Sequence, residues 1–260
     1  MIPNRHPIPS TTQEQIASLT SLLCESTQEN LVGIYAHGSL AMGCFNPLIS
    51  DIDLLVITQQ PMSLQVRRQI LDRLLCLSGT PHPVEISVVH YAQIIPWRHP
   101  TLFDFHYSEV WRAIAQAVLA GEPHIALPNG EDSDLAGHFT VLMRRGYSLA
   151  GAPIAALQLS VPWKDYLDSV HIDFTWAVSS GQAGPIYVVL NACRCWAAVT
   201  TGVVLSKMEG GIWAAERVPA QFRPLLIRAC AAYSGEAAES TISDAEACTF
   251  HHWIADRLGW

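Results

Sequence analysis

One segment near the N-terminus constrains the fold most, because it places two apolar runs on either side of a turn of small residues. The run LVGIYA (31–36) predicts a buried strand that enters a turn at His37-Gly38-Ser39. The run DIDLLVIT (51–58) predicts a second strand shortly afterwards. Strand, turn and strand in this order favour an α/β region with a sheet at its centre.

Three carboxylates are predicted to gather at this sheet. Asp51 and Asp53 lie two residues apart at the start of a strand, so their side chains point to the same side. The run VEISVV (84–89) predicts a third strand whose polar face carries Glu85. Carboxylates placed in this way repel one another unless a divalent cation lies between them, and Mg²⁺ prefers hard oxygen ligands that share a site with phosphate. Asp51, Asp53 and Glu85 are therefore the predicted metal site.

Gly38 and Ser39 are the predicted phosphate-binding residues. Small residues after a strand let backbone N–H groups and a hydroxyl approach a phosphate. Taken alone, a Gly-Ser pair is usually a turn, and an Asp-x-Asp motif is usually a solvated strand end. The joint order of strand, Gly-Ser, Asp-x-Asp strand and strand with glutamate favours metal-dependent nucleotidyl transfer.

The chain is expected to form two domains, at residues 1–125 and 126–260. The turn-rich segment 122–134 is the predicted connection. Before it, apolar spacing predicts helices at 12–24, 63–77 and 104–119, with Ser63 as a cap. After it no alternating segment is evident, and helices are predicted at 134–150, 163–178, 185–201, 219–233 and 241–258. The predicted class is α+β, with an N-terminal α/β domain around a mixed sheet and a C-terminal helical bundle.

Composition excludes several classes of protein. The 260 residues carry a formal charge of −8 and only two lysines, Lys164 and Lys207, which disfavours non-specific nucleic-acid binding. No apolar run reaches membrane-spanning length, and the N-terminus has no signal-peptide core. The seven cysteines lack zinc-ligand spacing. A cytoplasmic, monomeric protein is expected, without nucleic-acid or membrane partners, and its acid excess suits a small cationic ligand.

At these residues the sequence resembles a known family. Gly38-Ser39 followed by Asp51-Ile52-Asp53 is similar to the motif of the DNA polymerase β-like nucleotidyltransferases. Further stretches resemble the aminoglycoside O-adenylyltransferases that act on streptomycin and spectinomycin. They are SDIDLLVIT (50–58), VEISVVHYAQIIPWRHP (84–100), LNACRCWAAVTTG (190–202) and SKMEGGIWA (206–214).

The resemblance implies an activity and a role for each site residue. The reaction would transfer AMP from ATP to a hydroxyl of an antibiotic, with Mg²⁺ on Asp51 and Asp53 and the triphosphate on Ser39. Glu85 would be the general base that takes the proton of the hydroxyl. Arg194 and Lys207 match family residues of the helical domain that contact ATP when the domains close. The acceptor is expected in the cleft between the domains.

The sequence departs from the family around the acceptor. Eleven residues separate Ser39 from Asp51, one more than in close relatives. Trp111 is displaced by one position from the family tryptophan that stacks on the drug, which turns it by about 100° on a helix. Gly184 and Tyr187 stand where relatives carry an acidic residue and a histidine. The acidic drug contact is therefore missing there, and Asp173, Asp165 or Asp168 could substitute for it. Candidate acceptor residues are Trp111, Asp173, Trp176 and Tyr187.

Other functions stay open at this point. The chain could adenylylate another small molecule or a protein hydroxyl. It could also be a nucleotide-binding module without turnover on the same fold, although the intact set of Ser39, Asp51, Asp53 and Glu85 argues against this. A nucleotidyltransferase directed at nucleic acid is disfavoured by the scarcity of lysine.

Overall fold

The computed structural model describes residues 8–122, 129–236 and 242–260. The chain divides into two compact units, Met1–Pro162 (unit 1) and Trp163–Trp260 (unit 2). The boundary expected from the sequence lay earlier, at residues 125 and 126. Of the connection predicted at 122–134, residues 123–128 lie outside the described part of the chain.

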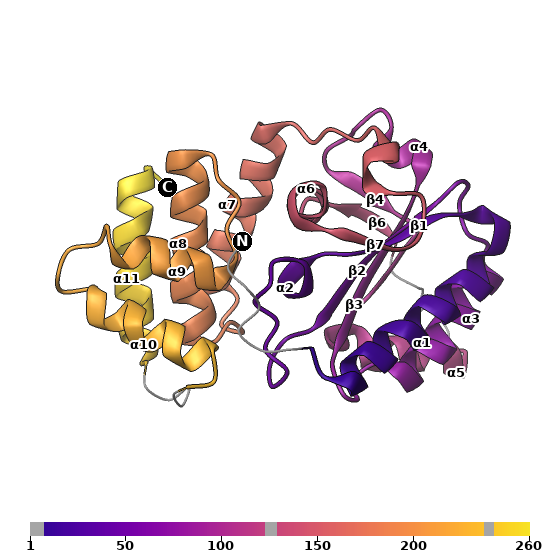
Figure 1. The fold of residues 1–260 in the computed structure, drawn as a ribbon, viewed down its shortest axis with the longest axis horizontal. Coiled ribbons are helices and arrows are strands. Elements are labelled where there is room, and N and C mark those ends of the chain that lie inside the picture. Colours follow the sequence, from indigo (N-terminus) through magenta and orange to yellow (C-terminus); the bar gives the residue numbers. More distant parts are fainter. Residues whose placement is uncertain (1–7, 123–128, 237–241) are drawn as a thin grey trace. The chain divides into compact units, whose positions relative to one another are not determined.

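Unit 1 is built from a mixed sheet with helices on both faces (Figure 1). Its described helices are α1 (Ser10–Thr27), α2 (Gly38–Ala41), α3 (Leu64–Leu77), α4 (Tyr91–Ile94), α5 (Arg112–Ala120) and α6 (Leu135–Arg145). Its described strands are β1 (Leu31–Ala36), β2 (Ile52–Thr58), β3 (Val84–His90), β4 (Thr101–Phe103), β5 (Phe105–Tyr107), β6 (Gly130–Asp132) and β7 (Tyr147–Gly151). The mixed sheet and the helical second unit agree with the predicted fold class.

The main sheet has the strand order β5-β3-β2-β1-β7. Strands β2 and β3 run parallel, whereas the pairs β1–β2, β1–β7 and β3–β5 are antiparallel. The parallel register places Asp53 opposite Glu85. Strands β4 and β6 form a separate antiparallel pair. The topology therefore brings the two strands that carry the predicted carboxylates side by side at the centre of the sheet.

Both faces of the sheet are covered by apolar packing. Leu54 and Val56 of β2 pack into a cluster with residues of α1, α3 and α5, whereas Leu55 and Ile57 pack with residues of α4 and α6. Because alternate residues of a strand point to opposite faces, Asp53 shares the face of Leu55 and Ile57. Glu85, its neighbour in register, lies on the same face, so both carboxylates are on the α6 side of the sheet.

Two predictions about unit 1 were wrong. The helix predicted at 104–119 is in fact β5, the 3₁₀ turn η2 (Glu109–Trp111) and α5. The helix predicted at 134–150 ends with α6 at Arg145, and β7 follows it, although no strand was expected after residue 121. Strand β7 is short and largely exposed, so it has no alternating apolar pattern, and only its pairing with β1 defines it.

The regular elements in the described part of unit 2 are all helices. Its helices are α7 (Trp163–Ser179), α8 (Pro185–Thr201), α9 (Lys207–Ala215), α10 (Arg223–Tyr233) and α11 (Asp244–Leu258). The prediction for α8 is confirmed, since Pro185 at its first turn and Gly202 in the left-handed region after it are standard helix ends. The prediction for residues 241–258 extends to residue 241, which lies outside the described residues.

Helix α9 was not predicted, because two glycines interrupt its apolar pattern. A Cβ on Gly210 would lie 2.8 Å from the backbone nitrogen of Arg194, and a Cβ on Gly211 would lie 2.7 Å from Leu190 Cδ2. These residues lower helix propensity by about 1 kcal/mol each relative to alanine. They allow α9 to approach α8 closely, and a capping box between Ser206 and Glu209 fixes the start of the helix.

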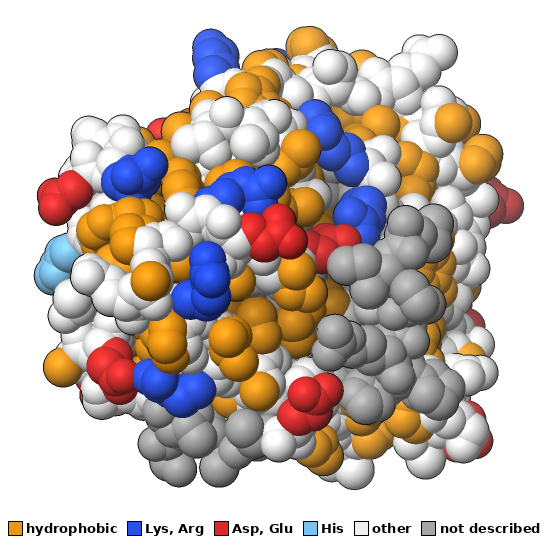
Figure 2. Space-filling model, turned by 60° about the vertical axis from the view of Figure 1, so that its left-hand side comes forward, with side chains coloured by type: hydrophobic (Ala, Val, Ile, Leu, Met, Phe, Trp, Pro, Cys, Tyr) orange, Lys and Arg blue, Asp and Glu red, His pale blue; other side chains and the backbone are white. Residues whose placement is uncertain are grey.

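No helix in the described part of the chain is long and apolar enough to cross a membrane. On the face drawn in Figure 2, Lys and Arg side chains are interspersed with acidic and hydrophobic ones. The net charge of −8 is therefore not gathered into a single acidic patch on that face.

Candidate active site

The turn after β1 holds Gly38 and Ser39 against β2. The backbone N–H of His37 donates a hydrogen bond of 3.1 Å to the carbonyl of Asp53. Gly38 has a φ of +57°, and a Cβ at this position would overlap the Asp53 carboxylate. The hydroxyl of Ser39 is buried and has no hydrogen-bond partner among the described residues. Because buried polar groups are normally paired, this hydroxyl is suited to donate to a ligand oxygen.

The carboxylates of β2 and β3 form one acidic group. Asp53 and Glu85 are paired in register, and Asp51 directly precedes β2. Burial raises the pKa of Glu85, the charge of His138 lowers it, and the neighbouring Asp134 and Asp51 raise it again, with a raised pKa as the result. A partly buried carboxylate of raised pKa accepts a proton more readily than an ordinary glutamate, as a general base requires.

The acidic group does not form a complete protein cage for a metal ion. Among residues 8–122, 129–236 and 242–260, no three His, Cys, Asp or Glu side chains are arranged to hold one. Mg²⁺ is usually bound by one or two carboxylates together with substrate phosphates and water. The hard oxygens of Asp51 and Asp53 fit an ion that binds together with phosphate, and Asp53 contacts the turn that carries Ser39. The set of three carboxylate ligands stays a prediction.

Sequence reasoning missed His138, which faces Glu85 from α6. Its Nε2 lies 3.8 Å from Glu85 Oε1 and 3.4 Å from Asp134 Oδ2, and its ring centroid lies 4.8 Å from that of His37. Burial alone would lower the pKa of His138, but Asp134, Glu85 and Asp132 raise it to about 10. His138 is therefore a cation at neutral pH. The sequence shows Asp134 and His138 four residues apart on one helix, but it has no signal that joins them to β3.

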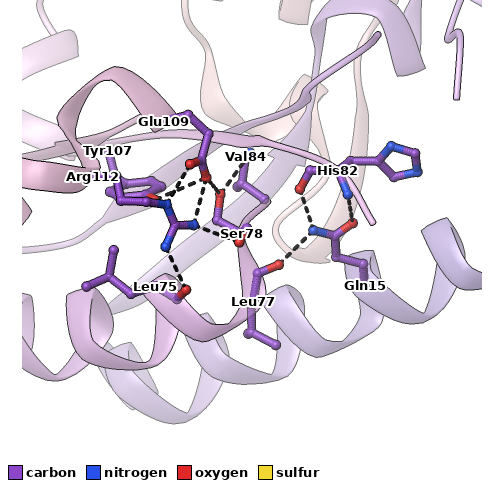
Figure 3. Close-up of polar contacts among 9 residues, drawn as sticks. All are labelled: Gln15, Leu75, Leu77, Ser78, His82, Val84, Tyr107, Glu109 and Arg112. Carbon is purple, nitrogen blue, oxygen red and sulfur yellow. Dashed lines mark hydrogen bonds and ion pairs between the residues drawn. The ribbon is translucent and has the colours of Figure 1, made fainter. Parts of the chain in front are cut away.

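Trp111 lies in η2, and its side chain is 37% exposed. A network of polar contacts holds this turn against the end of α3 (Figure 3). Arg112 Nε pairs with Glu109 Oε2 at 2.7 Å, and its Nη2 donates to the carbonyl of Ser78 at 2.7 Å. The hydroxyls of Ser78 and Tyr107 both donate to Glu109. The turn that presents Trp111 is thus fixed from several directions.

We expect Glu109→Gln to reduce the free energy of unfolding at pH 7 by about 2 kcal/mol, because hydrogen bonds to a charged group are lost. The Arg112 hydrogen bond lowers the pKa of Glu109 below its ordinary value of 4.5. A group whose folded pKa is lowered stabilises the fold above its unfolded pKa, and this contribution disappears as pH falls through the folded pKa. The difference between wild type and variant, measured by chemical denaturation, should therefore stay constant well above pH 4.5 and shrink as the pH falls below 4.5.

Glu25→Gln is the matched control for this experiment. Glu25 pairs with Arg73 at 2.8 Å, but both side chains are about half exposed, so the change should cost less than about 0.5 kcal/mol. Equal losses for Glu25→Gln and Glu109→Gln would contradict a special role for the network around Glu109.

The other predicted residues meet in unit 2. Arg194 Nη2 donates to Asp173 Oδ2 at 2.6 Å, and the Tyr187 hydroxyl donates to Asp173 Oδ1 at 2.6 Å. Lys207 Nζ lies 4.4 Å from the centroid of the Tyr187 ring. The Trp176 ring meets the Tyr187 ring edge-on at 6.0 Å, and Trp176 is 43% exposed. The structure thus brings the predicted ATP contacts and three predicted acceptor contacts of unit 2 into one cluster.

Two sequence families match parts of the chain. The nucleotidyltransferase domain family matches residues 21–100. The family described as aminoglycoside adenylyltransferase, C-terminal domain, matches residues 157–256. The first match contains Ser39, Asp51, Asp53 and Glu85, and the second begins close to the boundary between units 1 and 2.

Similar proteins extend over most of the chain. An aminoglycoside (3'') (9) adenylyltransferase of Klebsiella pneumoniae is 30% identical, over 85% of each chain. One of Escherichia coli is 29% identical, over 94% of each, and a spectinomycin 9-adenylyltransferase of Staphylococcus aureus is 27% identical, over 80% of this chain and 79% of its own. A spectinomycin adenyltransferase from Enterococcus, solved with ATP and spectinomycin, has the same fold. Its TM-score is 0.80 at 22% identity, over 95% of this chain and 99% of that one.

Proposed function

The chain belongs to the aminoglycoside adenylyltransferases, and on this premise we propose that it transfers AMP from ATP to a hydroxyl of a cationic aminoglycoside or aminocyclitol antibiotic. The reaction requires Mg²⁺ and releases pyrophosphate. Spectinomycin and streptomycin are the first candidate acceptors. One observation carries the proposal: the Ser39 hydroxyl, buried and unpartnered among the described residues, belongs to the turn that packs against Asp53, and Asp53 pairs in register with Glu85 on one face of the sheet.

In this proposal Glu85 is the general base. It accepts the proton of the acceptor hydroxyl, and its raised pKa makes it a stronger base than an exposed glutamate. His138, a cation at neutral pH, lowers the pKa of Glu85 and so favours the carboxylate form that can accept the proton. Glu85 is therefore assigned to proton transfer, and Asp51 and Asp53 are assigned to the metal ion.

Ser39 and the cations of unit 2 bind the triphosphate of ATP. The buried Ser39 hydroxyl donates to a phosphate oxygen. Because Gly38 has no Cβ, the backbone of that turn can lie close to the Asp53 carboxylate. Arg194 and Lys207, which both belong to the cluster around Tyr187, supply positive charge for the phosphates. Asp51 and Asp53 would hold Mg²⁺, which would supply positive charge to the triphosphate and to the leaving pyrophosphate.

Exposed aromatic side chains are the proposed acceptor contacts. Trp111 on η2 and Trp176 on α7 are both more than one-third exposed, which is more than a tryptophan that packs in a core exposes. Aromatic faces bind cations and apolar ring surfaces, and carboxylates near the site attract a positively charged acceptor. The family difference at Trp111 supports spectinomycin alone, or an acceptor of different shape, as the substrate.

The decisive test is pyrophosphate release from ATP and Mg²⁺ over a panel of aminoglycosides and aminocyclitols. We expect release with at least one member, at a rate that depends on both ATP and drug. Mass spectrometry should show that the drug gains one AMP. Absence of release with every member would contradict the proposed substrate class. If a drug binds tightly but gives no product over hours, the chain is instead a binding module on the same fold.

A further inference from the structure

We infer that Asp173 and Tyr187 are positioning residues that hold the Arg194 guanidinium and the Lys207 ammonium ready for the phosphates of ATP. This inference rests on the proposed function, in which Arg194 and Lys207 contact ATP. It replaces the acceptor-amine contact that the sequence predicted for Asp173. All four residues lie in unit 2, on α7, α8 and α9.

The hydrogen bonds of Asp173 support a positioning role. Each of its two carboxylate oxygens already accepts a hydrogen bond of 2.6 Å, one from Arg194 and one from Tyr187. The Asp173 side chain is only 18% exposed, whereas that of Arg194 is 32% exposed. An amine of an acceptor would therefore have to compete with a permanently charged guanidinium for a carboxylate that is mostly buried.

Arg194 is restrained but keeps donors for a ligand. Its Nε donates to Asn191 Oδ1 at 2.6 Å, and its Nη2 donates to Asp173. Within the described residues Nη1 makes no hydrogen bond. Burial lowers the pKa of Arg194, but the Asp173 carboxylate more than offsets this and keeps the pKa above its ordinary value. A planar guanidinium fixed at two nitrogens presents the remaining donors in a set direction, as phosphate recognition requires.

Lys207 is placed by the same cluster. It is the first residue of α9, whose start is fixed by the Ser206–Glu209 capping box. Gly210, one turn later, allows α9 to pack against the backbone of α8 at Arg194. The ring of Tyr187 supports the ammonium at 4.4 Å, while its hydroxyl bonds to Asp173. Tyr187 therefore connects both cations, so that one network of contacts orients the pair.

The test uses the full chain and measures the Kd of ATP with Mg²⁺ by calorimetry, without any acceptor. We expect Asp173→Asn to weaken ATP binding about tenfold, because the guanidinium loses its charged partner and its fixed direction. If the carboxylate mattered only through its charge, removing an acid beside the phosphates would instead tighten ATP binding. Asp256→Asn, an equal change of charge at an exposed position of α11, is the control and should leave the Kd within about twofold.

Two further variants separate positioning from folding. Tyr187→Phe removes one hydroxyl and keeps the ring beneath Lys207, so ATP binding should weaken about threefold with little change in Tm. Asp173→Glu should restore part of the affinity lost in Asp173→Asn. If Asp173→Asn does not fold, Tyr187→Phe decides: a Kd equal to that of wild type would overturn the inference.

Steady-state kinetics with spectinomycin adds a second readout. Positioning predicts that the KM for ATP rises in Asp173→Asn while the KM for the drug stays the same. A higher drug KM with an unchanged ATP Kd would overturn the inference and restore the amine contact. Failure of wild type to bind ATP would contradict the proposed function itself, whereas wild-type binding with an unchanged Kd in Asp173→Asn overturns only this inference.

Discussion

Glu85→Gln is expected to lower kcat about a thousandfold, within the range of 10²–10⁴ that a positioned general base contributes. Glutamine has nearly the same size and keeps a polar group next to His138, so the sheet should remain intact. It cannot accept a proton, however, and the acceptor hydroxyl then loses its base. ATP affinity should change little, because no phosphate contact is assigned to this side chain.

The measurement is pyrophosphate release at saturating ATP and drug, together with an ATP titration. Glu131→Gln is the control, since Glu131 is an exposed glutamate on β6 and no role is assigned to it. If Glu85→Gln keeps more than one-tenth of the wild-type kcat, proton transfer from the hydroxyl does not depend on this carboxylate.

Gly38→Ala is the second variant with a large expected effect. The new Cβ would overlap the Asp53 carboxylate, and an L-residue at a φ of +57° costs about 1–2 kcal/mol. Relief of the overlap requires Asp53 or the Ser39 turn to move. Because a displacement of about 1 Å can cost about a hundredfold in rate, we expect kcat/KM to fall by at least that factor.

Gly121→Ala provides a matched comparison. Gly121 also has a positive φ, of +79°, but a Cβ there meets no atom of the described residues within 4 Å. Both variants therefore carry backbone strain, and only Gly38→Ala disturbs the carboxylates. Tm should fall in both, whereas kcat/KM should fall only in Gly38→Ala. Equal kinetics in the two variants would contradict the assignment of the Gly38 turn to the active site.

The buried strands and the motif residues on them could be predicted from the sequence. The apolar runs that became β1, β2 and β3 are continuous because both faces of these strands are covered. The alternation in VEISVV correctly separated Glu85 from the face of Val84 and Ile86. Local spacing was sufficient there because the carboxylates sit on adjacent strands in register.

What the sequence did not reveal depends on contacts between distant segments. Strand β7 has little apolar character of its own and exists through its pairing with β1. Helix α9 contains two glycines that its packing against α8 requires, and these hide its helical pattern. His138 approaches Glu85 only because α6 covers one face of the sheet.

The pairing of β7 with β1 determines where the chain can be joined to a relative in a hybrid protein. The Tyr35 hydroxyl of β1 donates to the carbonyl of Ala152, just after β7, so the last strand of unit 1 is bound to its first. A hybrid with a relative that is joined near residue 125 would take β7 and His138 from one parent and the carboxylates from the other. A junction at residues 162 and 163 keeps the sheet and the acidic group from a single parent and exchanges unit 2 as a whole.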